Sequence, residues 1–123
     1  MIPAKIQLHK QSRILELQFG TQSYQLGAEY LRVHSPSAEV KGHGPSQAVL
    51  QFGKREVGIS GIERAGNYTL KILFDDGHDS GIYTWDYLYQ LSVEQEGNWQ
   101  AYLDALAAAG KSREKDTSVV KFV

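Results

Sequence analysis

The chain has 123 residues, 41% of them hydrophobic, which is enough for one domain with a packed core and too few for two ordinary domains. A net charge of −1 argues against a general nucleic-acid binder and against a polybasic membrane surface. The chain has no cysteine, so it has no disulfide, no thiolate nucleophile and no cysteine metal site. It has no apolar run of signal-peptide or membrane-spanning type, so we expect a cytoplasmic protein.

The first part of the chain predicts three short strands followed by a helix. Residues 5–9 and 13–19 alternate apolar with polar side chains, and a short third strand follows at 24–26. The spacing then changes and predicts a helix of about two turns over 27–34. Pro36 ends it, because the residue before a proline avoids helical geometry.

Residues 35–46 contain two prolines and two glycines around His43, and their composition predicts a loop that is long for a compact domain. Alternation predicts a strand at 48–52 and another at 57–65. Glycines along the second strand indicate a bulge or a close backbone approach.

Residues 68–91 read as one unit. Alternation over 68–74 predicts a strand, and Asp76-Gly77 is a strong signal for a tight hairpin turn, in which the glycine supplies positive φ. Residues 79–83 return along the first strand. Thr84 is then placed to cap a helix with an inward face at helical spacing, formed by Trp85, Leu88 and Leu91.

A second helix follows, with Asn98 as its expected cap and Gly110 as its stop. Its predicted inward face consists of Trp99, Tyr102, Leu103 and Leu106. We therefore expect a small single α+β domain over residues 5–110, a mostly antiparallel sheet of short strands with two or three short helices on one side. Residues 111–123 are expected to be a polar linker and an apolar tail; the tail is a frayed end, an added edge strand or a partner-docking strand.

No grouping of residues predicts catalysis. The four histidines show no H-x-x-x-H spacing, and the chain has no Walker loop and no G-x-S-x-G elbow. We expect His9 to be a surface residue, His34 to bond the last carbonyls of its helix, and His78 to fix the hairpin turn. His43 is either a loop tip or a ligand on a flexible arm.

Three aspartates crowd the hairpin turn, namely Asp75, Asp76 and Asp79. Their oxygens could suit a hard cation, but aspartate is also a common turn former, and turn chemistry is the better interpretation. The residue chemistry alone therefore predicts a protein that is not an enzyme.

The segments "NYTLKILFDDGHDSGIYTWDYL" and "EYLRVHSPSAEVKGHGP" resemble the gamma-butyrobetaine hydroxylase-like N-terminal domain family, and the resemblance covers nearly all of residues 5–105. Its most specific parts are Asp76-Gly77-His78, Gly81-Ile82-Tyr83 and Leu31-Arg32. In bacteria such domains often stand alone without an assigned function. Similar domains also precede iron- and 2-oxoglutarate-dependent catalytic domains, or are joined to ATPases that carry iron–sulfur clusters.

In the hydroxylases, the resemblance implies a zinc ion held by three cysteines and one histidine. The thiol positions fall here on Ser35, Ser37 and Val40, and the histidine on His78. Hydroxyl groups are poor zinc donors and valine is none, so the family zinc site should not be carried over.

Two alternatives replace that site. In the first, the loop folds over the hairpin and His34, His43 and His78 form a weaker metal site. In the second, hydrogen bonds hold loop and hairpin together, with Ser35 or Ser37 contacting His78 where zinc would have bridged them.

For function, we expect a non-catalytic accessory or binding domain that acts through an unknown protein partner, with no nucleic acid or membrane involved. The loop at 35–46, the apolar tail and the aromatic residues Tyr83, Tyr87 and Tyr89 are the predicted contact surfaces, since tyrosine is enriched at interfaces. The alternative is a metal-linked role, either metal binding through histidines or docking in iron–sulfur cluster assembly.

Overall fold

The computed structural model describes residues 1–42 and 48–115, which form two three-stranded antiparallel sheets, three helices of six or more residues and one single-turn helix. In chain order they are β1 (Lys5–His9), β2 (Ile14–Phe19), β3 (Gln22–Gly27), α1 (Ala28–Val33), α2 (Ala38–Lys41), β4 (Ile59–Arg64), β5 (Thr69–Phe74), β6 (Gly81–Thr84), α3 (Trp85–Val93) and α4 (Gln95–Ala109). The predicted α+β class is confirmed.

Each sheet is built from strands that follow one another in the chain. The first has the order β1-β2-β3 and the second β4-β5-β6, and β1 contacts β4 where the sheets meet. The alternation predicted from the sequence is observed, because every second residue of β2 and of β5 is buried. The predicted irregularity in the fourth strand is also present, as a register shift between Ile59 and Gly61.

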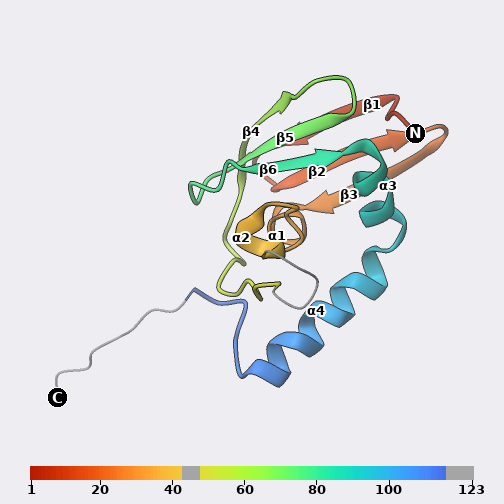
Figure 1. Ribbon diagram of the computed structural model, residues 1–123. Coiled ribbons are helices and arrows are strands. Elements are labelled where there is room, and N and C mark those ends of the chain that lie inside the picture. The colour runs from red at the N-terminus through yellow and green to blue at the C-terminus, as the bar shows by residue number, and fades with distance from the viewer. Residues whose placement is uncertain (43–47, 116–123) are drawn as a thin grey trace, which may run out of the picture.

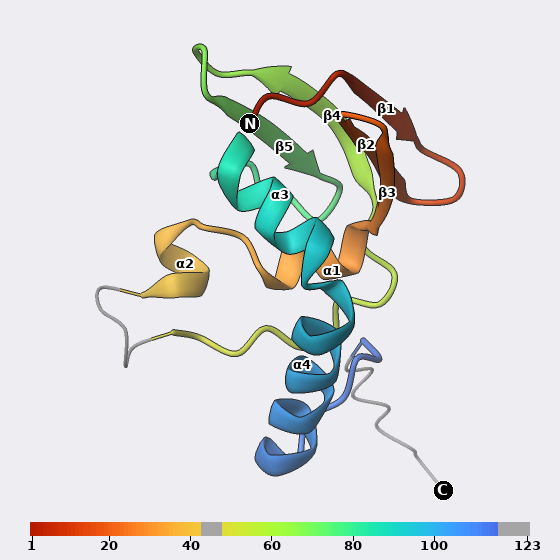
Figure 2. The same ribbon diagram turned by 90° about the vertical axis from the view of Figure 1, so that its right-hand side faces the viewer.

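One hydrophobic core lies between the two sheets and the helices α1 and α3. The helices lie on one side of the sheets, as predicted, and α4 extends away from them (Figures 1 and 2). The fully enclosed members of the core come from both sheets and both helices: Leu15, Leu17, Leu26, Leu31, Leu70, Ile72, Tyr83, Leu88 and Leu91. This shared core fixes the end of α1 against the β5–β6 hairpin.

A smaller core attaches α4 to the end of α1. Tyr102 and Leu106 on α4 pack against Val33, with Trp99 and Leu50 beside them. Gly110 ends α4 in the left-handed conformation at φ 65°, which confirms the predicted stop. None of the helices in residues 1–42 and 48–115 is long and apolar enough to cross a bilayer.

The beginning of α4 differs from the prediction. Thr84 caps α3 through the amide of Tyr87, as expected, but α4 begins at Gln95 and not at Asn98. A single residue, Glu94, separates the two helices, so the chain continues from one into the other with little interruption. Asn98 lies within the first turns of α4, where its side-chain amide donates to the Tyr30 hydroxyl at 3.0 Å.

Two other predictions are wrong in detail. Part of the predicted loop at 35–46 is the helix α2, and the predicted strand at 48–52 is irregular. The backbone groups of that segment bond elsewhere, since the Val49 amide donates to the Val40 carbonyl and the Gln51 carbonyl accepts from the Tyr102 hydroxyl. His43 and residues 116–123, with the apolar tail, lie outside the described residues.

Residues 111–115, predicted to begin the linker, are bonded to the domain. The carbonyls of Ser112 and Arg113 accept the amides of Gly53 and Arg55. The Arg113 guanidinium makes two hydrogen bonds to Glu29, at 2.9 and 2.6 Å, and lies 5.0 Å from the centre of the Trp99 ring. A bidentate arginine–carboxylate pair is among the stronger polar contacts, which explains why this polar stretch is attached.

The hairpin turn supplies a first test. Gly77 has a φ of +88°, where a side chain is strained, whereas Gly97 lies in α4 with open space around its Cβ position. We expect Gly77→Ala to lower the free energy of unfolding by about 1–2 kcal/mol. Gly97→Ala should raise it by about 0.5 kcal/mol, because alanine favours helix. Urea unfolding compares the two, and an unchanged midpoint for Gly77→Ala would contradict the turn geometry.

Candidate functional site

Three polar side chains meet where the chain leaving α1 crosses the β5–β6 hairpin. The Ser35 Oγ lies 2.9 Å from the His78 Nε2, and the Ser37 Oγ lies 3.3 Å from the same nitrogen. The two hydroxyls also contact each other at 3.3 Å, and all three side chains are buried. We call Ser35, Ser37 and His78 the serine–histidine cluster. The prediction that hydrogen bonds hold loop and hairpin together here is confirmed.

The cluster occupies the positions where the family resemblance implies zinc, so its donor set can be compared with what zinc requires. Zinc sites use thiolate, imidazole or carboxylate ligands, and two neutral hydroxyls beside one imidazole do not supply them. Val40, at the third thiol position, is buried and has no donor atom. Across residues 1–42 and 48–115 there is no group of three or more His, Cys, Asp or Glu side chains that could hold a metal ion. The residues present therefore do not fit the family zinc site.

The remaining histidines are spread over the fold. His34 places its Nδ1 2.8 Å from the Tyr30 carbonyl, which confirms its predicted role at the end of α1. His9 is on β1, with its Nε2 3.1 Å from Glu16. His43 lies outside the described residues, so the three-histidine metal site stays a prediction.

A partly buried ion pair links α1 to the hairpin turn. The Arg32 Nε donates to the Asp76 Oδ2 at 2.9 Å, and the other Asp76 oxygen accepts the His78 amide at 3.1 Å. Lys54 adds a contact to the same carboxylate at 3.2 Å. Burial acts to raise the Asp76 pKa, but the His78 amide and the Arg32 guanidinium outweigh it and hold the pKa below its usual range.

Two of the three most specific parts of the resemblance, Leu31-Arg32 and Asp76-Gly77-His78, are therefore in direct contact. Asp75 also accepts a backbone amide, that of Gly58, at 2.9 Å. The bond from the His78 amide to Asp76, two residues back, confirms the turn-chemistry interpretation for Asp76, whereas Asp75 accepts an amide from outside the turn.

Three tyrosine hydroxyls attach the end of α1 to α3 and β6. Tyr83 donates to the Leu31 carbonyl at 2.5 Å, Tyr87 to the His34 carbonyl at 2.6 Å and Tyr30 to the Leu91 carbonyl at 2.6 Å. Burial raises the pKa of Tyr87 to about 12, so its hydroxyl remains a donor at neutral pH.

The predicted aromatic contact surface is only partly accessible. Tyr83 is 0% exposed, so the prediction that it contacts a partner is wrong: its ring is needed in the core. Tyr89 is half-buried, with its ring 5.1 Å from that of Phe19. Tyr87 is half-buried too and carries the Lys41 ammonium 4.6 Å from its ring centre. The Tyr87 side chain also lines a pocket.

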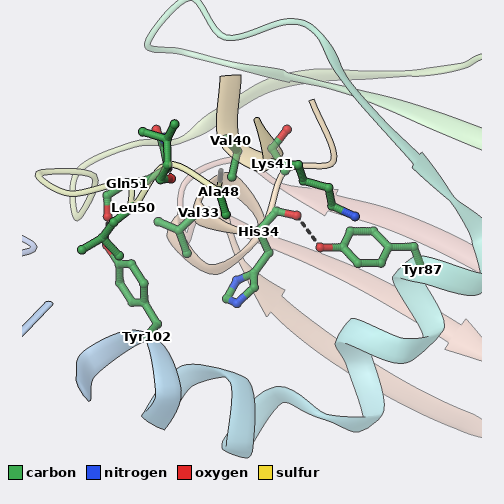
Figure 3. A pocket seen from close by; sticks show the side chains of 11 residues that line it. Val33, His34, Val40, Lys41, Ala48, Leu50, Gln51, Tyr87 and Tyr102 are labelled. Atoms are coloured by element: carbon green, nitrogen blue, oxygen red, sulfur yellow. Dashed lines mark hydrogen bonds between the residues drawn. The ribbon is translucent and has the colours of Figure 1, made fainter. Parts of the chain in front are cut away.

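The pocket lies between the end of α1, the α2 turn, the irregular segment at 48–51 and the helices α3 and α4 (Figure 3). Its volume is about 390 Å³, within the range of small-ligand sites. Its lining is mainly apolar and consists of Val33, His34, Ser35, Val40, Lys41, Ala48, Val49, Leu50, Gln51, Tyr87 and Tyr102. The serine–histidine cluster therefore lies directly behind one wall.

Sequence reasoning missed this pocket. Its apolar wall at 48–51 was predicted as a strand, and Tyr102 was predicted only as part of a helix face. Of the alternating residues Ala48, Leu50 and Phe52, only Leu50 packs in the core beside α4, whereas Ala48 and Phe52 are exposed. Nothing in the sequence shows that α1 and α4 meet at this point.

Comparison with known proteins agrees with the fold and with the family resemblance. The family model described as gamma-butyrobetaine hydroxylase-like, N-terminal, matches residues 6–89. The chain therefore belongs to the gamma-butyrobetaine hydroxylase-like N-terminal domain family, which confirms the resemblance. A comparison with curated proteins found no match.

Solved structures resemble the chain over most of its length. One solution NMR structure is 60% identical, covers 99% of this chain and 97% of its own, and has a TM-score of 0.83. A second is 44% identical over 99% of this chain and 93% of its own, with a TM-score of 0.79. A crystal structure of a protein of unknown function from Acidithiobacillus ferrooxidans, described as a DUF971 family member, is 31% identical over 73% of this chain and 91% of that chain, with a TM-score of 0.60.

The serine–histidine cluster supplies a second test. His78→Ala removes a buried ring and leaves two buried hydroxyls without it, so we expect a loss of about 2–4 kcal/mol in the free energy of unfolding. The loss should be the same with added zinc and with a chelator. His9→Ala, on the surface of β1, is the control and should change stability by at most about 1 kcal/mol. Zinc that stabilises the wild type but not His78→Ala would instead support a metal site.

The ion pair supplies a third test. Arg32→Met leaves the partly buried Asp76 carboxylate with only Lys54 as a cation, so we expect a loss of about 3 kcal/mol. Arg55→Met removes an exposed pair with Glu114 and should change the free energy of unfolding by about 0–1 kcal/mol. Equal urea midpoints for the two variants would show that the buried pair does not hold α1 to the turn.

Proposed function

We propose that this protein is a non-catalytic binding module that acts through a partner protein. The observation that carries the proposal is the open, mainly apolar pocket, whose tyrosine and glutamine wall groups are already hydrogen-bonded within the domain. A site that performs chemistry needs a positioned acid, base or nucleophile that a substrate can reach. Among the described residues that line this pocket, the one imidazole, that of His34, is bonded to the Tyr30 carbonyl, and no hydrogen bond joins it to an acid or a nucleophile. The rest of the wall offers surface for contact.

Among residues 1–42 and 48–115, the serine–histidine cluster is the arrangement that most resembles catalytic machinery. Its 2.9 Å contact between Ser35 and His78 is the spacing of a nucleophile and its base. However, Ser35 is 0% exposed, and its hydroxyl is also in contact with Ser37. A nucleophile must approach a reacting atom, and this hydroxyl is enclosed, so we assign the cluster a structural role.

Apolar side chains near the pocket support a protein-binding surface. Val49 is 52% exposed and Phe52 is 44% exposed, although large apolar side chains are costly to leave in water. Interfaces are typically apolar and aromatic at the centre, with charge at the rim. The pocket with Lys41, Val49 and Tyr87 follows this pattern, and we call it the pocket face. The occurrence of similar domains joined to other domains also favours action through a partner.

Charge placed on the pocket face tests the proposal. The wild type, Val49→Glu and Val93→Glu would each be expressed with a tag in the native host, cross-linked and analysed by quantitative mass spectrometry. Val93 is the control because it is 48% exposed but lies at the end of α3, outside the pocket lining.

We expect a defined set of proteins that the wild type and Val93→Glu recover equally and that Val49→Glu recovers at least about tenfold less, since a desolvated charge opposes burial of the face. Equal recovery by all three would place the contact elsewhere. No recovery above the tag alone would contradict the proposal itself.

A further inference from the structure

Among the described residues that line the pocket, His34 has a ring nitrogen that no hydrogen bond reaches. The His34 Nδ1 lies 2.8 Å from the Tyr30 carbonyl, and because a carbonyl only accepts, Nδ1 carries the proton. Burial lowers the pKa of His34, so its imidazole is neutral at neutral pH. In a neutral imidazole with a protonated Nδ1, the Nε2 is a bare acceptor.

This acceptor is accessible from the pocket. The His34 ring extends from the end of α1 into the space between Tyr102 and Tyr87 (Figure 3). In the described part of the chain no hydrogen bond reaches its Nε2, and no buried side-chain nitrogen or oxygen lacks a partner. The Nε2 is therefore in contact with solvent and available to a donor.

The other polar groups of the wall are engaged. The Tyr87 and Tyr102 hydroxyls donate to the carbonyls of His34 and Gln51, at 2.6 and 2.7 Å. The Gln51 side chain accepts from Arg32 at 3.2 Å and donates to the Val49 carbonyl at 3.2 Å. An occupant of this pocket is thus selected by an apolar shape and by a single hydrogen-bond donor.

The positive charge of Lys41 lies at the rim of the pocket. The Lys41 side chain is exposed, and its ammonium lies over the Tyr87 ring. Within residues 1–42 and 48–115 it forms no ion pair, whereas Lys54, Arg55 and Arg113 each contact a carboxylate. Charge complementarity therefore favours an anionic group next to the apolar part of the occupant.

We propose that the pocket receives a tyrosine or tryptophan side chain of the partner protein, with an acidic residue beside it. Both side chains combine an apolar ring with a single donor, which is what the pocket selects. Phenylalanine and leucine would fill the same space but leave the His34 acceptor desolvated without a partner, at a cost comparable to a lost hydrogen bond. In this arrangement the aromatic ring of the partner fills the pocket as the central anchor. The carboxylate of the neighbouring acidic residue contacts Lys41.

This inference rests on the proposed function and can be tested without knowing the partner. The first probes are p-cresol, which is the tyrosine side chain, and 4-methylanisole, in which a methyl group replaces the donor hydrogen. Binding would be followed by amide and side-chain NMR shifts. We expect p-cresol to shift residues of the pocket, namely His34, Leu50, Tyr87 and Tyr102, and to bind about five- to tenfold more tightly than 4-methylanisole, which is the worth of one hydrogen bond.

His34→Phe should abolish this preference while keeping the apolar contacts. The comparison between the two probes uses wild-type protein, so it stands even if His34→Phe is unstable. Equal affinity of the two probes, shifts elsewhere on the protein, or no binding of p-cresol up to its solubility would each overturn the inference.

The second pair of probes is N-acetyltyrosine, with a free carboxylate, and its uncharged amide. We expect the carboxylate to bind about threefold more tightly at low salt, and Lys41→Gln to remove this preference without changing the affinity for p-cresol. If Lys41→Gln still binds N-acetyltyrosine more tightly than its amide, the proposal that an acidic residue lies beside the aromatic ring is wrong. If these probes do not bind while Val49→Glu still recovers fewer partner proteins, the proposal of an aromatic anchor is refuted. The proposal that the protein is a binding module then still stands.

Discussion

The contact between Arg32 and Asp76 determines how the rest of the structure is arranged around the pocket. Arg32 is buried on α1, and its guanidinium reaches both the hairpin turn and the Gln51 side chain. The Asp76 carboxylate in turn accepts hydrogen bonds from the His78 amide and from the Lys54 ammonium. One guanidinium therefore connects the helix, the turn and the irregular segment that forms a pocket wall. Arginine suits this position because its planar group presents several donors in fixed directions and remains charged when buried.

With that contact in place, the chain after α1 is held against the hairpin by hydrogen bonds. The positions where the family resemblance implies zinc-binding thiols carry Ser35, Ser37 and Val40 here, and the geometry brings the two hydroxyls to the histidine. A metal ion connects its ligands strongly and tolerates some variation in packing around it. Hydrogen bonds are weaker individually, and they require close packing and exclusion of water. The complete burial of Ser35 is consistent with that requirement.

Much of the fold could be predicted from the sequence, and the reasons are local. Alternation in β2 and β5, the positive φ of Gly77, the Thr84 cap and the Gly110 stop each depend on only a few neighbouring residues. The contact between the serines and His78 could be predicted from the family pattern, because the fold keeps those positions adjacent even after the thiols are lost.

The features that were not predicted depend on contacts between distant segments. The 48–52 segment has the spacing of a strand, but its hydrogen bonds go to Val40 and to Tyr102 on α4. Asn98 is a good cap residue by type, yet its amide is used by Tyr30 across the helix interface. Tyr83 belongs to a tyrosine-rich stretch, and only the packing shows that it is internal. The pocket was not predicted for the same reason, since its walls come from five separate segments.

The junction between α3 and α4 has a mechanical consequence for this pocket. Tyr87 lies on α3 and Tyr102 on α4, so the two rings that border the pocket stand on opposite sides of Glu94. Rotation about the backbone of this exposed residue changes the angle between the helices and with it the separation of the rings. The packing of Tyr102 and Leu106 against Val33 resists that rotation. The separation of the two rings is thus fixed by the apolar packing of Val33, Tyr102 and Leu106 together with the hydrogen bonds of Asn98 to Tyr30 and of Tyr102 to Gln51.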